Sequence, residues 1–336
     1  MNVIDIYEAL YFANQLPRPL EISGFHVDTD SFSEEGCIKL FRFSQGEIRI
    51  LVESLNIPDQ IKVQEGYTCK GLEALCIALR RLSYPGRWAD LQPLFGRSSS
   101  SLCAIFLHIV EYLNNTHQNV INFDANRIGY NLQHFSQAIY EAGAPLDNCW
   151  GFIDGTVRPI ARPTKGQRFF FNGHKRTHSI KFQTIVYPDG IIAHCSYPME
   201  GTRHDSALLR NSNIGDIIQN DHRFDGYLIY GDPAYPQNLQ YVTGPFKGII
   251  NEDQQNFNKE MSKHRVCVEW GFALVLNNWI YLEHKRTLKV LGSPVGSFYL
   301  LAVLLTNCLT CLKGSNQVSA RFGLHPPNLN EYLNHQ

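Results

Sequence analysis

The chain has 336 residues, of which 44% are hydrophobic and 18% are charged, and its formal net charge is −1. This composition is typical of a globular protein, and the length allows two domains of roughly 150 residues each. The most apolar run, residues 298–312, is shorter than the roughly 20 residues that a membrane helix needs, which excludes a spanning segment there and favours a soluble protein. The near-neutral charge excludes no partner, because it can hide separate basic and acidic surfaces.

Cysteine usage predicts the compartment. The nine cysteines are odd in number and scattered, and the chain opens with Asp5 and Glu8 rather than with a basic and then apolar leader. We therefore expect a reducing, intracellular location. The close pair Cys308 and Cys311 has no second pair to complete four zinc ligands, so both are expected in a core helix and no zinc site is assigned.

Residues 1–145 are predicted to form a helical domain, because apolar residues recur there at spacings of three and four. The segment at about 71–113 contains a helix, a break at 84–86, a short helix, a turn at 95–97 and a serine-capped helix. This outline is typical of a helix-turn-helix, although helical bundles that never bind DNA share it.

Four arginines cluster around this segment: Arg80, Arg81, Arg87 and Arg97. They suit phosphate contacts, and Arg87 and Arg97 are our candidate DNA-binding residues here. The candidate recognition helix itself carries no Lys or Arg, so the pattern gives only weak support to sequence-specific readout.

The hydrophobic period changes after Pro145, which predicts a second domain over residues 146–315 and a tail over 316–336. The second domain is expected to be of the α+β or α/β class, with a mixed sheet. Its predicted elements are strands at 149–154, 178–187, 191–197 and 226–230 and helices at 206–218 and 262–277. A Pro-Asp-Gly turn joins the second and third strands into a hairpin.

Three acids of this domain stand in apolar sequence: Asp154, Asp232 and Glu269. A lone carboxylate is costly to bury unless it is paired, hydrogen-bonded or bound to metal. Two strand ends and a helix over the same sheet can bring the three together, and Mg²⁺ takes carboxylate oxygens as ligands. Two such ions stabilise the attacking and leaving oxygens of a displacement at phosphorus. The acids therefore predict phosphodiester cleavage or transfer.

Each acid also has a purely structural interpretation. Asp154 precedes a glycine and Asp232 precedes a proline, so both can shape turns, and Glu269 can pair with Arg265 one helical turn earlier. Against the ion pair alone, Glu269 lies in line with apolar residues at helical spacing, so we expect it to point from an apolar stripe. These residues are Val266, Ala273 and Leu276.

The residues between Asp154 and Asp189 include no acid. They include seven cations, namely Arg158, Arg162, Lys165, Arg168, Lys175, Arg176 and Lys181. Basic groups neutralise phosphates, and aromatic rings such as the phenylalanines at 169–171 stack on unpaired bases, so this stretch is a candidate DNA-binding segment. The alternative is a solvated hairpin edge with the phenylalanines in the core.

Residues 201–206 precede the helix predicted at 206–218. Asp205 is placed to cap that helix, and His204 can contact DNA, approach the acids or close a turn. Both are taken as accessory candidates.

These blocks, in this order, resemble the motifs of PIF/Harbinger-type transposases and the nucleases derived from them. The matching segments are GFIDGT at 151–156, FNGHKR at 171–176, GTRHDS at 201–206, GDPAYP at 231–236, VEWGF at 268–272 and PVG at 294–296 with LLTNC at 304–308. The resemblance covers about residues 70–315. Phe171 and Trp270 depart from it, where the family often has tyrosine and arginine, but neither change removes a metal ligand.

The resemblance implies a ribonuclease H-like catalytic domain with a DDE metal site, preceded by a helical region with a helix-turn-helix. Asp154, Asp232 and Glu269 match the catalytic acids, which would hold two Mg²⁺ or Mn²⁺ ions with Asp154 bridging them. His204 and Asp205 match an accessory motif. Family members act in the nucleus on terminal inverted repeats and on A/T-rich target DNA, commonly with a separate Myb-like protein partner.

We therefore expect a divalent-metal-dependent DNA endonuclease and strand-transferase that acts at element ends, located in the nucleus and the cytoplasm. One alternative is a domesticated DNA-binding or adaptor protein that keeps the fold without catalysis. Another is a stand-alone DNA-processing nuclease that transfers no strand. A homo-oligomer is compatible with each of these functions, and none of them needs a membrane.

Overall fold

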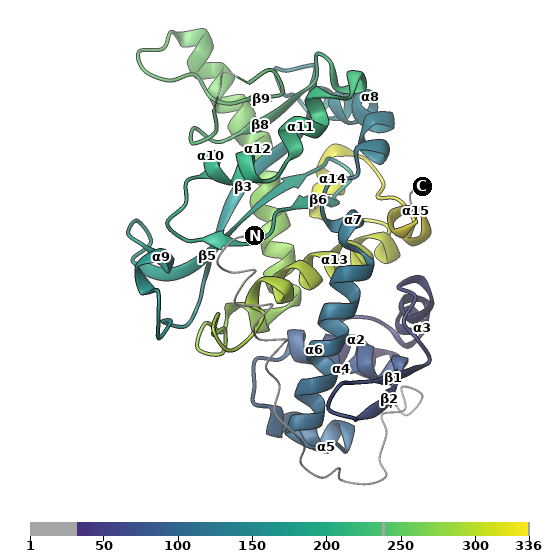
Figure 1. Cartoon of the computed structure of the whole chain (residues 1–336). Coiled ribbons are helices and arrows are strands. Elements are labelled where there is room, and N and C mark those ends of the chain that lie inside the picture. Colours follow the sequence, from purple (N-terminus) through teal and green to yellow (C-terminus); the bar gives the residue numbers. More distant parts are fainter. Residues whose placement is uncertain (1–31, 237–238, 335–336) are drawn as a thin grey trace. The chain divides into compact units, whose positions relative to one another are not determined.

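A computed structural model describes residues 32–236 and 239–334 (Figure 1). The start of the predicted helical domain, with Asp5 and Glu8, lies outside the described residues. The chain divides into two compact units. Of the described residues, unit 1 comprises 32–118, 160–164 and 276–305, and unit 2 comprises 119–159, 165–236, 239–275 and 306–334.

Unit 1 is mostly helical, with a small hairpin that the apolar pattern did not predict. Its elements are α2 (Glu34–Phe41), α3 (Gln45–Ser54), β1 (Gln60–Lys62), β2 (Thr68–Lys70), α4 (Gly71–Ser83), η2 (Trp88–Leu91), α5 (Gln92–Phe95), α6 (Ser99–Thr116) and η4 (Ile280–Glu283). In the hairpin, Ile61 pairs with Cys69, and both are buried between exposed neighbours. Three residues per strand are too few for alternation to be distinguished from a loop.

The predicted helix-turn-helix segment consists of α4, η2, α5 and α6, and residues 88–95 are bent by 92° from α6. The Ser98 hydroxyl caps α6 by accepting a hydrogen bond from the Ser101 amide at 3.2 Å. Half of α6 is buried, since nine of its 18 residues, including Phe106 and Leu107, lie in the core. The other residues of α6 are partly or fully exposed, so its predicted role as a recognition helix, which needs an exposed face to enter a DNA groove, stays a prediction.

The arginines around this segment have different surroundings. Arg97 is buried, and its guanidinium donates hydrogen bonds of 2.6 and 2.9 Å to the Glu73 carboxylate. A buried bidentate ion pair already uses the charge of Arg97, so this placement does not support its predicted contact with a phosphate. Arg87, in contrast, is exposed.

Unit 2 is built around a mixed sheet of seven described strands in the order β4-β5-β3-β8-β9, with β6 and β7 paired to β5. The strands are β3 (Cys149–Pro159), β4 (Phe171–Asn172), β5 (Thr177–Val186), β6 (Ile192–Cys195), β7 (Met199–Glu200), β8 (Leu228–Gly231) and β9 (Val242–Thr243). The helical elements of the same part of the chain are α7 (Gln118–Ile121), α8 (Ala125–Glu141), α9 (Gln167–Phe170), α10 (Asp205–Asn211), α11 (Ile214–Gln219), η3 (His222–Phe224), α12 (Glu252–Asn278), α14 (Gln317–Phe322) and α15 (Leu329–Leu333). Helices and a mixed sheet together confirm the α+β class.

The predicted hairpin is confirmed, since β5 and β6 pair antiparallel on either side of the turn at 188–190. The helix predicted at 206–218 is two helices, because Asn213 adopts a left-handed conformation with φ of 55° between α10 and α11. Asparagine tolerates this conformation better than most residues. The helix that carries Glu269 begins earlier than predicted, at Glu252.

The core of unit 2 surrounds Trp150 on β3. The Trp150 ring contacts the rings of Tyr187 and Phe224, with centroid separations of 5.5 and 5.8 Å, and Phe135 on α8 lies 5.3 Å from Tyr187. Burial of each large apolar side chain contributes roughly 1.5–3 kcal/mol. The same core therefore fixes β3, the strand that carries Asp154.

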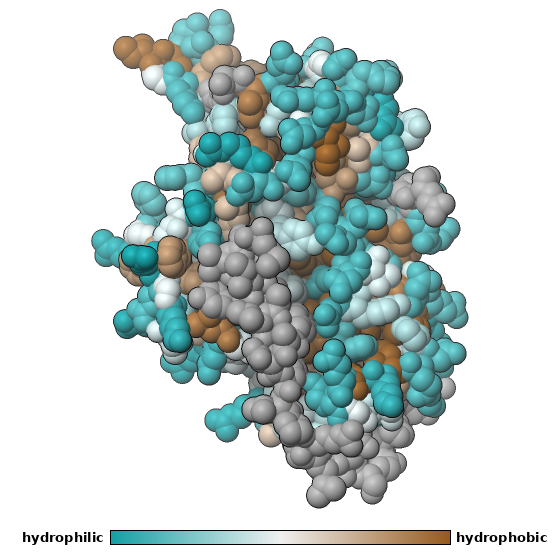
Figure 2. Space-filling model, viewed as in Figure 1, coloured by the Kyte–Doolittle hydropathy of each residue, from teal (hydrophilic) through white to brown (hydrophobic). Residues whose placement is uncertain are grey.

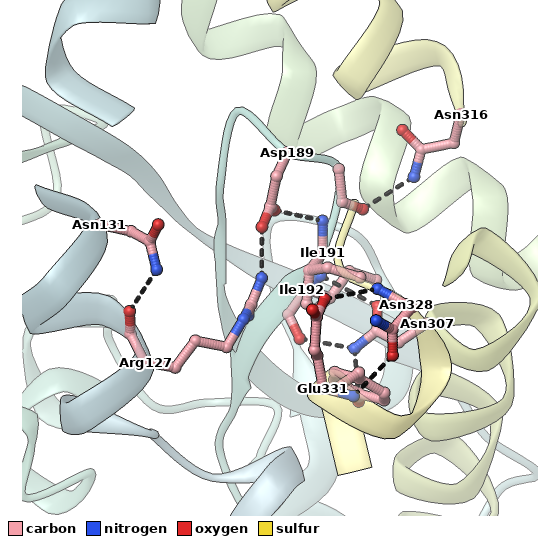
Figure 3. Close-up of polar contacts among 11 residues, drawn as sticks. Arg127, Asn131, Asp189, Ile191, Ile192, Asn307, Asn316, Asn328 and Glu331 are labelled. Atoms are coloured by element: carbon pink, nitrogen blue, oxygen red, sulfur yellow. Dashed lines mark hydrogen bonds and ion pairs between the residues drawn. The ribbon is translucent and has the colours of Figure 1, made fainter. Parts of the chain in front are cut away.

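The segment expected to be a C-terminal tail contains α14 and α15, and its Asn316 holds the β5–β6 hairpin together with Asn307, which lies before this segment (Figure 3). The Asn307 side chain accepts a hydrogen bond from the Ile192 amide at 3.0 Å and donates one to the Ile192 carbonyl at 2.8 Å. Asn316 donates to the Gly190 carbonyl at 2.8 Å. In the same turn, buried Asp189 pairs with Arg127 of α8. These contacts fix the hairpin next to β3.

Helix α13 (Val295–Lys313) is long and apolar enough to cross a membrane by length and composition alone. Most of it is buried within the protein, as in the core helices of soluble proteins, so this is weak support for a membrane span. Cys308 and Cys311 lie buried on α13, and all nine cysteines are free thiols. Figure 2 shows mostly hydrophilic residues on the visible face.

Candidate active site

Sheet register brings two of the three predicted acids side by side. Strands β3 and β8 are parallel neighbours, with Ile153 opposite Gly231. Asp154 and Asp232 each come one residue later, so they occupy equivalent positions on chains that run roughly 4.8 Å apart. Because side chains alternate along a strand, both carboxylates are directed to the same face of the sheet.

The Asp154 carboxylate is mostly buried, with 17% of the side chain exposed. Its Oδ1 accepts a hydrogen bond from the Gly155 amide at 2.7 Å, and its Oδ2 accepts one from Arg265 Nη1 at 2.8 Å. Burial raises the pKa of Asp154 to about 6, although Arg265 and the Gly155 hydrogen bond lower it. Asp232 and Asp205 raise this pKa further, so the three carboxylates share one electrostatic environment.

Asp232 also shapes the turn that follows β8, because its Oδ1 accepts a hydrogen bond from the Ala234 amide at 2.9 Å. This turn buries Tyr235, whose hydroxyl has no hydrogen-bond partner among the described residues. Burial raises the pKa of Tyr235 well above its ordinary value, and Asp205, Asp154 and Asp232 add to the increase. The Tyr235 hydroxyl is therefore near all three acids.

Asp205 is not the helix cap that its position predicts. His204 is the N-cap of α10, without a side-chain cap hydrogen bond, and Asp205 is the first helical residue. The Asp205 carboxylate forms an ion pair of 2.8 Å with Lys181 of β5, and the two side chains are 14% and 11% exposed. It lies against Gly155, where an added Cβ would be 2.1 Å from Asp205 Oδ1. Only glycine at position 155 leaves room for this carboxylate beside Asp154.

Glu269 differs from the two strand acids. Its side chain is 57% exposed, and its apolar neighbours Val266 and Ala273 lie on the same partly exposed face of α12. The buried face of this helix instead carries residues such as Met261, Cys267 and Val275, so the predicted apolar stripe is not a buried one. The expected ion pair with Arg265 is present, at 3.5 Å.

Arg265 is the functional candidate that the sequence analysis missed. Its guanidinium contacts both Asp154 and Glu269 and therefore links the strand acids to α12. Its position four residues before Glu269 predicts an ion pair within the helix, but it does not predict a contact with a distant residue. The long-range contact with Asp154 depends on how α12 packs on the sheet, which the spacing does not reveal.

The chemistry of these donors fits a hard divalent cation. They are carboxylate oxygens, and the buried Tyr235 hydroxyl beside them lacks a protein partner. Within residues 32–236 and 239–334, no three His, Cys, Asp or Glu side chains form a group that could hold a metal ion. The donors therefore fit by type, while a guanidinium supplies the positive charge at Asp154.

The seven cations predicted to bind DNA differ in their exposure. Lys181 is buried in its pair with Asp205, which already uses its charge, so this placement does not support its predicted contact with a phosphate. Arg158 is partly buried and donates a hydrogen bond of 2.6 Å to the Thr156 hydroxyl. The exposed members are Arg162, Lys165, Arg168, Lys175 and Arg176.

Two of the three adjacent phenylalanines are exposed among these cations. Phe169 and Phe171 are 41% and 45% exposed, whereas Phe170 is fully buried. The Arg168 guanidinium lies over the Phe169 ring at 4.9 Å. Figure 2 shows hydrophobic surface beside hydrophilic residues where Figure 1 places α9. The core interpretation therefore holds for Phe170, and the two exposed rings remain available for stacking.

Comparisons with known proteins agree with this geometry. Residues 153–307 match the model of a family described as DDE superfamily endonuclease. The probable transposase for insertion sequence element IS702 from Microchaete diplosiphon is 25% identical over 125 residues, which cover 35% of this chain and 42% of that protein. The chain thus spans less than half the length of this relative. No solved structure matches. Residues 153–307 are therefore similar to a DDE superfamily endonuclease domain, and the mixed sheet with its helices is consistent with a ribonuclease H-like α+β fold.

Proposed function

We propose that this protein is a divalent-metal-dependent DNA nuclease of the DDE type that cuts and joins strands at the ends of a mobile element. The observation that carries the proposal is the equivalent position of Asp154 and Asp232 on two neighbouring parallel strands. The family match over residues 153–307 and the likeness to a transposase support the same chemistry. The proposal includes action in the nucleus, terminal inverted repeats as DNA substrate and a Myb-like partner.

In this proposal Asp154, Asp232 and Glu269 hold Mg²⁺ or Mn²⁺, with Asp205 as an accessory carboxylate. Two bound ions would supply an activated nucleophile and stabilise the leaving oxygen at phosphorus. The sheet fixes the spacing of Asp154 and Asp232, and Lys181 holds Asp205 beside them at 2.8 Å. Burial around Asp154 keeps water from screening these charges, which strengthens every electrostatic interaction at the site.

We propose that the DNA backbone contacts the exposed cations around α9 and β4, chiefly Arg168, Lys175 and Arg176. Their charge is not consumed in a buried ion pair, unlike that of Lys181 and Arg97. Unpaired bases can stack on Phe169 and Phe171. The other exposed candidates are Arg87, Arg162 and Lys165.

An Asp232→Asn variant tests the catalytic assignment. The asparagine side-chain oxygen can still accept the hydrogen bond from the Ala234 amide, so the turn should survive while the negative charge is lost. We expect Mg²⁺-dependent cleavage of DNA to fall by about 10³-fold, since metal ligation is worth several kcal/mol at the transition state. The control is Asp225→Asn, an exposed acid ahead of β8, which should cleave normally.

Full cleavage by Asp232→Asn would contradict the assignment of Asp232 as a catalytic residue. Strand transfer is tested separately, by supplying a DNA end with a free 3′-hydroxyl and looking for joined product. Cleavage without joining would indicate a nuclease that processes DNA and transfers no strand.

A DNA-binding protein without catalysis is the second candidate. The contact between Arg265 and Asp154 favours it, because a guanidinium already neutralises one of the required ligands. This function predicts DNA binding that is indifferent to Mg²⁺ and unchanged by Glu269→Gln. Cleavage by the unmodified protein that Asp232→Asn abolishes would exclude it.

A further inference from the structure

Arg265 makes the contacts that decide whether a cation can reach Asp154. Its Nη1 donates to Asp154 Oδ2 at 2.8 Å, and its Nη2 donates to Glu269 Oε1 at 3.5 Å. The second oxygen of Asp154, Oδ1, accepts the Gly155 amide at 2.7 Å. Both Asp154 oxygens are thus engaged, and the guanidinium places a positive charge where a cation would approach Oδ2.

The charges around Arg265 explain why the guanidinium occupies this position. Lys181 is paired with Asp205, which leaves Asp154 and Glu269 to be neutralised by another cation. The Arg265 and Asp154 side chains are only 24% and 17% exposed, so their attraction is screened less than that of a surface pair. A divalent ion would neutralise the same carboxylates with twice the charge of the guanidinium. The two cations therefore compete for one carboxylate.

Close packing of α12 on the sheet opposes a movement of its backbone that would make room for such an ion. Gly271 packs on β5 so closely that an added Cβ would lie 2.9 Å from Val186 Cγ2. His264, Cys267 and Val268 of the same helix are buried. The simplest route for exchange at Asp154 is therefore rotation of the Arg265 side chain, which is partly exposed.

We propose that Arg265 is the resident counter-ion of this site: its guanidinium holds Asp154 and Glu269 while no divalent ion is bound and leaves Asp154 when an ion binds. This inference rests on the proposed function, because it requires a divalent ion at Asp154. Its consequence is that Arg265 lowers the apparent affinity for the ion. In the absence of the ion, Arg265 relieves the repulsion among the acids.

Calorimetric titration of the full chain with Mn²⁺ alone tests this competition. Arg265→Gln should bind Mn²⁺ about tenfold more tightly than the unmodified protein, because a charge-assisted hydrogen bond no longer has to be broken. The matched control is Lys263→Gln on the same helix, which removes an equal charge from a pair with Glu260 at 2.7 Å. That control should change the affinity less than about twofold. Equal or weaker binding by Arg265→Gln would overturn the proposal.

Arg265→Gln leaves Asp154 without its cation, so the variant can lose stability without metal. A second measurement therefore uses the unmodified protein and follows arginine Nε–Hε signals by NMR during titration with Mg²⁺. The Arg265 signal, identified by its loss in Arg265→Lys, should shift until the site saturates. An unshifted signal at saturation contradicts the exchange.

Failure of the proposed function gives a different result from failure of this inference alone. If Asp154 holds no ion, adding Asp154→Asn to the unmodified protein or to Arg265→Gln will not change Mn²⁺ binding. Both proposals are then wrong. If only the inference is wrong, Asp154-dependent binding will be present with the same affinity in both proteins.

Discussion

The site has a strand half, formed by Asp154 and Asp232, and a helix half, formed by Glu269 and Arg265 of α12. Different kinds of contact hold these two halves in place. Asp154 and Asp232 take their spacing from the pairing of Ile153 with Gly231, and the antiparallel neighbour β5 fixes Asp154 from the other side, opposite Thr184. Glu269 is 57% exposed, and among the described residues it is linked to Asp154 by Arg265. Backbone pairing has no rotamers, whereas a long exposed side chain has many. The strand half is therefore preassembled, and the helix half is free to adjust.

The loss of Mn²⁺ affinity in single variants tests the difference between the two halves most strongly. Asp154→Asn should weaken Mn²⁺ binding by about 10³-fold, because loss of a ligand from the preassembled half costs several kcal/mol. Glu269→Gln should weaken it only about tenfold, because an exposed side chain gains less from ordering around an ion. Calorimetry on both variants measures the difference. Equal losses would mean that the two halves are equally preorganised.

A smaller effect should separate buried from exposed cations near the strand half. Lys181→Met leaves Asp205 charged and unpaired in a nearly buried place, so the free energy of unfolding should fall by about 3 kcal/mol. Lys175→Gln, at an exposed position, should leave stability unchanged but reduce the salt dependence of DNA binding by about one unit of slope.

Urea unfolding measures the first quantity, and DNA binding at several salt concentrations measures the second. The double variant Lys181→Met with Asp205→Asn should recover part of the lost stability, since it removes the unpaired charge. If Lys181→Met instead lowers the salt slope while stability is retained, Lys181 is a phosphate contact after all.

The sheet itself offers a still smaller, pH-dependent test. Burial lowers the pKa of His194 on β6 to about 4, against a usual value of 6.5, although the hydrogen bond with the Asn122 carbonyl raises it. The unfolded chain takes up this proton below pH 6.5 and the folded chain does so only near pH 4, so stability present above pH 6.5 is lost as the pH falls between these values. At pH 5 the loss should be about 2 kcal/mol.

Asparagine at position 194 can keep the hydrogen bond to the Asn122 carbonyl but cannot take up a proton. Thermal unfolding of His194→Asn should accordingly show a weaker decline in stability between pH 6.5 and pH 4 than the unmodified protein shows. The same decline in both proteins would mean that His194 is accessible to protons in the folded sheet.

The strand half was predictable because its signals are local. The apolar runs that end at Asp154 and just before Asp232 mark buried strands, and residues that follow buried parallel strands gather at one edge of a sheet. The hairpin of β5 and β6 followed from alternation and a Pro-Asp-Gly turn. No tertiary information was needed for these elements.

The rest depends on packing between distant segments. The direction of Glu269 is set by which face of α12 meets the sheet, and here that face carries Gly271 rather than the apolar residues in line with Glu269. Likewise, Lys181 and Arg97 look like surface cations until their partners Asp205 and Glu73 are brought to them. Charge counts along a sequence do not tell a phosphate contact from half of a buried ion pair.

The close packing of Gly271 on Val186 also sets a timescale. Because packing opposes a shift of α12, we expect the protein's part in the exchange at Asp154 to be a rotation of the partly exposed Arg265 side chain, a local motion that is faster than the microsecond-to-millisecond shift of a helix. Mg²⁺ gives up its own water reluctantly. The rate of metal binding should therefore be set by dehydration of the ion. Mn²⁺ and Mg²⁺ should then bind at different rates, each set by how fast the ion releases water, and not at one rate imposed by the protein.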